Sequence, residues 1–388
     1  MTGRVSMADV ARRAGVSQKT VSRVVNGEAH VSRAVRERVL REIERLGFLP
    51  NENARALVTR KSRRIGVLTT SPSYHGPAAL LDGLERAARE AGYFVSIVHV
   101  HDGAARRPGE GQPGGRQPGA GEREPGAGGG GGGRPEDDVR RAVVHLVSQG
   151  VDGIVISAPV TGSADLAAAV PAGIPVLAMD FPEGGPRRGA LVVANDDAGG
   201  ARAITAYLLG LGHRTVHHLA GPPHWAATSR RLRGWRAALQ AAGAPVPEPR
   251  HGDWSPASGY RAARELLAET GPSGMTALFA ANDQMAIGAL HALERSGRSV
   301  PRDVSVAGFD DIPEAAYLTV PLTTVRQDFR AAAGQGMRRL VSAMAGTGEQ
   351  EGEELITPAL VVRESTAGPL PPGGRRDGPQ LRDGEGRP

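Results

Sequence analysis

The chain has 388 residues, 40% of them hydrophobic, and a formal net charge of +6. This length allows a sizeable buried core and predicts two or three domains. The absence of cysteine excludes disulfides and thiolate-held metal sites. The chain shows no apolar signal region at its start and no apolar run near the roughly 20 residues that span a bilayer. We therefore expect a cytoplasmic protein.

Residues 6–27 have the pattern of two short helices joined at a glycine. Ser6 and, three positions later, Asp9 form a capping-box pattern at the start of the first helix. Gly15 supplies the positive φ that ends this helix, and Ser17 caps the next one. The second helix turns polar and cationic side chains outward, namely Gln18, Lys19, Ser22 and Arg23. Such side chains read base edges in a major groove, so the pattern predicts a helix-turn-helix.

A third helix and an uneven charge distribution follow. Ser32 precedes a helical apolar pattern that ends at Gly47. Through Arg64 the chain has 15 Lys and Arg against 6 Asp and Glu, a net charge of +9, whereas the whole chain has +6. Positive charge is therefore concentrated in this part, as expected where phosphates are neutralised. An ordinary three-helix bundle with a solvated polar face is the alternative, and the charge favours binding to nucleic acid.

Two segments rich in glycine and proline, residues 102–135 and 367–388, have too few apolar side chains to offset the entropy of ordering. We expect both to be disordered. The first contains an unbroken glycine run at 128–133, which lacks the Gly-Lys-Ser/Thr ending and the preceding strand of a phosphate loop. We therefore interpret the run as part of a disordered insert.

Between Arg64 and Thr366 short β-rich runs alternate with helical segments. The expected strands are 65–68, 94–98, 151–157, 175–179, 190–193, 215–220, 277–280 and 304–308. The expected helices are 78–91, 137–149, 165–170, 199–211, 231–242, 259–269 and 285–296. This alternation predicts an α/β core of two doubly wound parallel sheets. Ligands of such sheets bind at the carboxyl ends of the strands.

Polar residues at the expected strand ends are therefore candidates for a ligand site. They are Thr70, Ser71, Asp180, Asn282, Asp283, Asp310 and Asp311. Arg231, at the start of an expected helix, and Trp254, in a loop, can reach the same cleft, whereas Trp235 is expected in the core. Taken singly, such residues have ordinary explanations, since an Asp or Asn after a strand is usually a turn or a helix cap. Together the carboxylates, amide, guanidinium and indole suit a polyhydroxylated neutral ligand.

Several stretches resemble the lactose-repressor/galactose-repressor family of transcriptional regulators. They are residues 9–26, 50–57, 211–213, 281–288, 300–311 and 322–326. The resemblance covers nearly the whole chain apart from the insert and the tail. It implies an all-α helix-turn-helix headpiece and a hinge helix, followed by a periplasmic-binding-protein-like core of two lobes. It also implies a repressor that binds double-stranded DNA in the nucleoid and needs no cofactor.

The domain boundaries expected from this resemblance are as follows. The headpiece is 1–50, and the hinge helix with its linker is 51–63. The N-terminal lobe comprises 64–193 with 329–353, and the C-terminal lobe comprises 194–326 with 354–366. Two symmetric headpieces require a near-palindromic operator, so a homodimer is expected. The tail has no leucine heptads, and tetramerisation through it is unsupported.

The resemblance also implies roles in DNA binding. Three residues would contact base edges: Gln18, Lys19 and Arg23. Four would hold the phosphate backbone or the turn: Ser17, Thr20, Ser22 and Asn26. Four belong to the hinge helix: Asn51, Ala54, Arg55 and Leu57. Leu57 would wedge into the central minor-groove step and kink the DNA, a plain apolar linker residue being the alternative.

Seven core residues fall at positions where lactose-responsive members of the family contact their sugar: Thr70, Asp180, Arg231, Trp254, Asn282, Asp310 and Gln327. Residues 252–259, 282–286 and 327–329 resemble this branch more than the purine-responsive one. Aromatic content is low, at 4%, which leaves little material for sandwiching a purine. The resemblance therefore implies a small sugar effector such as a galactoside, with a purine or another metabolite as the alternative.

The implied mechanism is allosteric. A ligand between the lobes would favour one lobe orientation and thereby change the affinity for DNA, with a coupling of typically about 1–3 kcal/mol. Induction is the family default, and corepression stays open. A transport-type sugar-binding protein is a second interpretation of the core, although it leaves the basic headpiece unexplained. An enzyme is a third, but no nucleophile-elbow, zinc-ligand or phosphate-loop motif is present, and no metal is expected.

Overall fold

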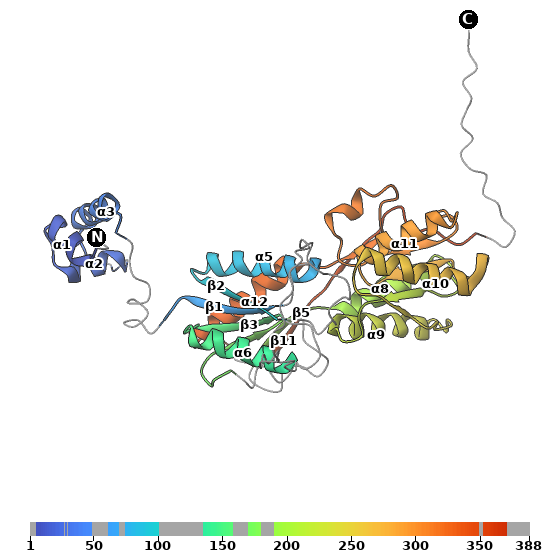
Figure 1. Cartoon of the computed structure of the whole chain (residues 1–388), viewed down its shortest axis with the longest axis horizontal. Coiled ribbons are helices and arrows are strands. Elements are labelled where there is room, and N and C mark those ends of the chain that lie inside the picture. The colour runs from blue at the N-terminus through green and yellow to red at the C-terminus, as the bar shows by residue number, and fades with distance from the viewer. Residues whose placement is uncertain are drawn as a thin grey trace, which may run out of the picture. The chain divides into compact units, whose positions relative to one another are not determined.

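The computed structural model describes residues 5–26, 28, 30–48, 61–69, 74–100, 135–157, 170–179, 190–348 and 352–370 (Figure 1). The chain divides into two compact units, Met1–Arg63 and Arg64–Pro388. Four regions singled out in the sequence lie wholly or largely outside the described residues: the hinge helix, the glycine-rich insert, the expected helix at 165–170 and most of the tail.

The first unit contains three helices, α1 Met7–Ala14, α2 Gln18–Val25 and α3 Arg33–Leu46. The expected capping box of α1 is confirmed, because Ser6 N donates to Asp9 Oδ2 at 3.0 Å and Ser6 Oγ accepts from Asp9 N. Gly15 ends the helix at φ 63°. Ser17 Oγ accepts from Thr20 N at 3.1 Å and begins α2. The core of this helix-turn-helix includes Val10, Val21, Val24, Val39 and Phe48.

The N-terminal lobe of the second unit is built on a six-stranded parallel sheet with the order β11-β5-β4-β3-β1-β2. Its strands are β1 Arg64–Thr69, β2 Phe94–His99, β3 Gly153–Ser157, β4 Val176–Ala178, β5 Ala190–Asn195 and β11 Gly352–Ile356. Helices α5 His75–Glu90 and α12 Phe329–Met344 cover one face, and α6 Pro135–Ser148 covers the other (Figure 1). Alternate β1 side chains divide accordingly, with Ile65 and Val67 toward α5 and α12 and Leu68 toward α6.

The C-terminal lobe has a four-stranded parallel sheet with the order β7-β6-β8-β9. Its strands are β6 His217–Ala220, β7 Arg250–His251, β8 Ala277–Ala280 and β9 Ser305–Ala307. Its helices are α8 Asp197–Gly210, α9 Ala226–Ala241, α10 Pro256–Gly274, α11 Asp283–Arg295 and the short 3-10 helix η2 Pro313–Ala316. Two parallel-sheet lobes therefore form the core, as the sequence predicted.

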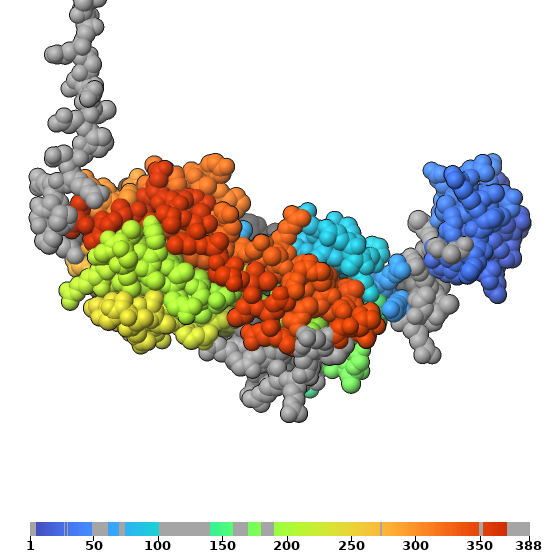
Figure 2. Space-filling view, turned by 180° about the vertical axis from the view of Figure 1, so that it is seen from behind, coloured from blue at the N-terminus to red at the C-terminus, as the bar shows by residue number. Residues whose placement is uncertain are grey.

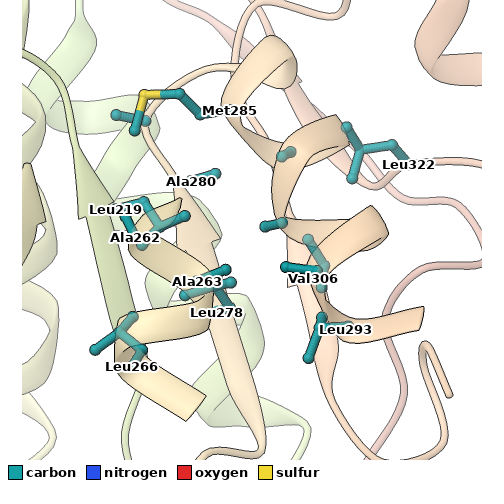
Figure 3. Close-up of a cluster of buried hydrophobic side chains, with 14 of the residues drawn as sticks. Leu219, Ala262, Ala263, Leu266, Leu278, Ala280, Met285, Leu293, Val306 and Leu322 are labelled. Carbon is teal, nitrogen blue, oxygen red and sulfur yellow. The ribbon is translucent and has the colours of Figure 1, made fainter. Parts of the chain in front are cut away.

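Each face of the C-terminal sheet has its own apolar core. Figure 3 shows one of them, where Leu219 and Val306 of the strands lie near Leu266 of α10 and Leu293 of α11. On the other face Trp235 of α9 is fully buried with residues of α8. Its Nε1 donates to the carbonyl of Val216 at 2.9 Å. The expectation that Trp235 is a core residue is therefore confirmed.

The chain crosses between the lobes three times, from β5 to α8, from β10 Thr324–Arg326 to α12, and from β11 to β12 Ala359–Val361. β10 and β12 form a separate antiparallel pair. In Figure 2 the orange and red segments of the later crossings run along one face of both lobes. β11 stays paired with β5 through Ile356, past the lobe boundary expected at residue 353. The sequence did not indicate this strand, because an exposed edge strand can carry polar residues such as Glu353.

Described structure reaches one end of each glycine-rich segment. α6 already begins at Pro135, the last residue assigned to the insert. Ala367 N donates to Ser305 Oγ at 2.9 Å, and the Ala367 carbonyl lies 2.9 Å from His213 Nε2. The prediction of disorder from residue 367 is therefore wrong at its start, because the backbone there finds partners on the C-terminal lobe. Among the described residues, no helix is long and apolar enough to cross a membrane.

We expect Trp235→Ala to lower the free energy of unfolding of the second unit by about 3–5 kcal/mol, because it removes a fully buried ring and its hydrogen bond. Urea unfolding measures this change. Val246→Ala, at a side chain with 43% exposure, is the control and should change stability by at most about 0.5 kcal/mol. Equal effects of the two substitutions would contradict the burial of Trp235.

Candidate functional site

The proposed DNA-contacting residues of the headpiece lie on or beside α2. Gln18 and Lys19 are exposed in its first turn, while Val21 and Val24 are buried on its inner side. Ser22 and Arg23 are half-buried, and Asn26 follows the helix. The helix therefore presents amide and ammonium groups to solvent while its valines hold it to the headpiece core.

Several of these polar side chains bond to one another. Ser17 Oγ and Thr20 Oγ1 lie 2.9 Å apart, and Asn26 Nδ2 donates to Ser22 Oγ at 3.3 Å. Arg23 Nε lies 3.6 Å from the Glu28 carboxylate, and both side chains of this ion pair are partly open to solvent. The local bonds keep α2 and its ends in place. Of the predicted DNA contacts, Asn51, Ala54, Arg55 and Leu57 lie outside the described residues.

A cavity within the second unit receives residues from both lobes. The N-terminal lobe contributes Tyr74, His75, Gly76, Pro77 and Phe329. The C-terminal lobe contributes Trp225, Ala227, Arg231, Trp254, Asn282 and Asp310, and Gln327 follows β10. The structure thus brings five predicted effector contacts to one cavity: Arg231, Trp254, Asn282, Asp310 and Gln327. Thr70 and Asp180 lie outside the described residues.

Arg231 is the buried cation of this cavity. Its Nε donates to Asp197 Oδ1 at 2.9 Å, and its Nη2 lies 3.4 Å from Asp310 Oδ1. Its Nη1 donates to the carbonyl of Ala281. The guanidinium carbon also lies 4.0 Å from the centroid of the Phe309 ring, a cation–π contact. The charge of Arg231 is therefore compensated on several sides.

The carboxylates around this cation have different pKa values. Burial opposes ionisation of Asp197, but Arg231 and Arg230 outweigh it and lower the pKa of that carboxyl. Burial raises the pKa of Asp310, although Arg231 and Gln327 Nε2, which donates to Asp310 Oδ1 at 2.7 Å, partly offset the rise. Burial raises the pKa of Asp283 to about 8, with a further contribution from Asp310. Asp283 is thus largely protonated at neutral pH.

Two residues of the cavity have backbone conformations that are rare for residues other than glycine. Asp310 has φ 104° and Trp254 has φ 70°. Asp310 is held by its N–H, which donates to the carbonyl of Val325 at 2.8 Å. Trp254 is held by Asn282 Nδ2, which donates to its carbonyl at 3.1 Å. Such strain persists where the surroundings fix it, and it is common at binding sites.

Asn282 also caps α11, since its Oδ1 accepts from Met285 N at 2.9 Å. Its second amide contact is with Gln284 Oε1 at 2.9 Å. The amide therefore has a structural function as helix cap and support for Trp254, besides any contact with a ligand.

The residues of the cavity and its support that sequence reasoning missed include Trp225, Tyr74, Phe329 and Asp197. Trp225 follows β6 and Tyr74 follows β1 across a short gap, so the strand-end rule that selected Asn282 applied to both. Both were overlooked because only polar residues were selected at the strand ends. Phe329 and Asp197 gave no comparable signal, because their positions depend on how helices α12 and α8 pack. Among the described residues, no group of three or more His, Asp or Glu is arranged to hold a metal ion.

The raised pKa of Asp283 predicts a pH effect on stability. Between about pH 4 and pH 8 the carboxyl is ionised in the unfolded chain but protonated in the folded one, so the free energy of unfolding falls as pH rises. In Asp283→Asn this part of the fall should vanish, because an amide does not titrate in this range. The amide has the shape of the carboxyl group, whose oxygens accept from Ile312 N and Thr324 Oγ1. Urea unfolding from pH 4.5 to 8.5 measures the difference.

Glu294→Gln, at an acid with 82% side-chain exposure, is the control and should run parallel to the wild type. A constant difference between wild type and Asp283→Asn across this pH range would show that the Asp283 pKa is not raised.

Comparison with known proteins links both units to one family. Residues 6–51 match the model of the bacterial regulatory proteins of the lacI family, and residues 205–366 match the periplasmic binding protein-like domain. The lactose operon repressor of Escherichia coli strain K12 is 32% identical over 369 residues, covering 94% of this chain and 91% of the relative.

Two solved structures agree with this. The lac repressor dimer bound to operator and the anti-inducer ONPF has a TM-score of 0.79 at 31% identity, covering 94% of this chain and all of that one. The complex of the transcriptional regulator CelR with cellobiose has a TM-score of 0.64 at 31% identity, covering 93% of this chain and all of that one. These relatives are transcriptional regulators and not enzymes. The chain belongs to the LacI family of bacterial regulatory proteins.

Proposed function

We propose that this protein is a transcriptional repressor that binds a near-palindromic operator as a homodimer, and that a small sugar bound between its core lobes changes its affinity for that operator. The related lac repressor is a dimer on its operator, and CelR binds cellobiose. The observation that carries the proposal is the cavity to which both lobes contribute, with Arg231, Asp310 and Gln327 at its polar end.

The polar groups of the cavity suit a sugar. A guanidinium, a carboxylate and an amide alternate within hydrogen-bonding distance of one another, so neighbouring hydroxyl groups find both donors and acceptors. Trp254, whose ring centroid lies 5.6 Å from Arg231 Cζ, offers an apolar surface beside them. Sites for small polar molecules combine such apolar walls with a few placed polar groups.

The two lobes would let a sugar bound between them affect DNA binding by the distant headpieces. A ligand that touches residues of both lobes stabilises the lobe orientation in which all these contacts form. We propose that this orientation sets whether paired headpieces and hinge helices fit the operator, with a coupling of about 1–3 kcal/mol. In this scheme Leu57 would insert into the minor groove, and Asn51, Ala54 and Arg55 would support it.

A transport-type sugar-binding protein is the second candidate for the core. The first unit argues against this candidate, because sugar transport does not account for a capped helix-turn-helix with exposed Gln18 and Lys19. Salt-sensitive binding of the full chain to duplex DNA from its own genome decides between the two.

Arg231→Ala should abolish the effect of sugar on operator binding while the operator affinity without sugar stays near that of the wild type, because the cavity loses its cation. Fluorescence anisotropy of a labelled operator, titrated with and without sugar, measures both. The matched control is Arg230→Ala, which removes another ion pair of Asp197, at 2.8 Å, but no residue that lines the cavity. A normal sugar response in Arg231→Ala would remove Arg231 from the site.

Lys19→Ala should relax discrimination at one base pair of the operator by about 1–3 kcal/mol, because the exposed ammonium group is positioned to contact a base edge. Competition binding at fixed salt against singly substituted operators measures this. Arg13→Ala, at an exposed residue of α1, should keep the wild-type ranking of operators. Equal weakening on every sequence would instead identify Lys19 as a phosphate contact.

A further inference from the structure

Three aromatic side chains that line the cavity contact one another in sequence, and we call them the aromatic wall: Trp254, Trp225 and Tyr74. The ring centroids of Trp254 and Trp225 lie 5.6 Å apart at an interplanar angle of 68°. Those of Trp225 and Tyr74 lie 5.1 Å apart at 81°. Because Arg231 lies against Trp254, the aromatic wall continues directly from the polar end of the cavity.

The aromatic wall holds hydrogen-bond donors for which the described residues provide no acceptor. The indole N–H groups of Trp225 and Trp254 are both buried, with residue exposures of 4% and 6%, and neither has a partner among the described residues. The third tryptophan, Trp235, shows the usual situation, since its N–H donates to a carbonyl. Buried indole N–H groups normally find an acceptor, so a ligand oxygen is the natural partner for these two.

The wall also joins the two lobes. Tyr74 precedes α5 of the N-terminal lobe, yet it packs against the apolar cluster of the C-terminal lobe that contains Trp225 and Trp254. Trp225 immediately precedes α9 without a side-chain cap. A ligand ring seated against Trp225 would therefore act at a contact between the lobes.

The polar end of the cavity has groups for the hydroxyls of one sugar ring, namely Arg231, Asp310 and Gln327. The part lined by Trp225 and Tyr74 has a different chemistry, with apolar ring faces and edges, the donor-only N–H of Trp225 and the hydroxyl of Tyr74. A pyranose ring matches it, because its C–H faces pack on aromatic rings and its oxygens accept from N–H donors.

We infer that the aromatic wall is a second subsite that takes the second ring of a disaccharide, so that the effector is a disaccharide and not a free monosaccharide. This inference rests on the proposed function and names its ligand class. Trp225 and Tyr74 are then the residues that determine specificity for the second ring, whereas the polar end of the cavity holds the first.

Calorimetric titration of the full-length protein with cellobiose, lactose, glucose and galactose tests the inference. At least one disaccharide should bind on the order of tenfold or more tightly than its component monosaccharides. Trp225→Ala should lower that affinity on the order of tenfold and leave the weak monosaccharide binding unchanged. Trp225→Phe, which keeps a ring but removes the N–H donor, should lie between Trp225→Ala and the wild type.

Two further variants protect the test from effects on folding. Tyr74→Ala removes the same subsite from the other lobe and should reduce disaccharide preference in the same way. Trp235→Phe changes a tryptophan outside the cavity and should keep the wild-type preference among the sugars. Thermal unfolding of each variant shows whether it is folded. If Trp225→Ala is not folded, Tyr74→Ala and Trp225→Phe test the second subsite in its place.

The outcomes separate the inference from the proposed function. If a monosaccharide binds as tightly as any disaccharide, or if Trp225→Ala binds disaccharides as well as the wild type does, the aromatic wall only fills space, and the inference fails while the sugar-controlled repressor stands. If none of the four sugars binds the wild type, the sugar effector fails and the inference fails with it.

Discussion

The cavity lined by both lobes depends on keeping Arg231 charged inside the protein. A buried guanidinium is unfavourable unless opposite charges and acceptors surround it. Asp197 of α8, Asp310 after β9 and the Ala281 carbonyl after β8 provide these. A single side chain of α9 is thus bonded to three other parts of the C-terminal lobe. The same ion network that stabilises this lobe also forms the polar end of the cavity.

Backbone strain contributes to the same rigidity. Asp310 and Trp254 both have positive φ values, which place a carboxylate and an indole at the cavity where a relaxed backbone would turn them elsewhere. Neutral Asp283, which accepts from Ile312 N at 2.9 Å, anchors the loop that follows Asp310. A site held in this way loses little freedom when a ligand arrives, which favours binding.

The headpiece and the cavity of the core are stabilised by different kinds of interaction. The headpiece uses local signals, with caps at Ser6 and Ser17 and a small valine-rich core around α2. The effector cavity uses long-range contacts between strand ends and between lobes, such as Tyr74 with Trp225. The lobes are joined by three chain crossings, an arrangement in which a few connecting residues can act as hinges.

The sequence by itself determined the features that depend on neighbours along the chain. Ser6, Asp9 and Gly15 predicted the first helix and its end, and alternation of apolar runs predicted the two parallel sheets. Residues directly after strands, such as Asn282 and Asp310, were found as cavity residues because strand ends share one edge of a sheet. Arg231 was expected at a helix start, but α9 begins earlier, at Ala226, without a side-chain cap to mark it.

Only the tertiary structure decided which distant side chains meet. Asp197 reaches Arg231 because α8 packs on α9, and Tyr74 reaches Trp225 because the lobes touch. No local pattern encodes these contacts, since they depend on sheet order, helix packing and lobe orientation together. Nor did the polar Glu353 and Glu354 reveal β11, because an edge strand is held by backbone bonds to β5 more than by buried side chains.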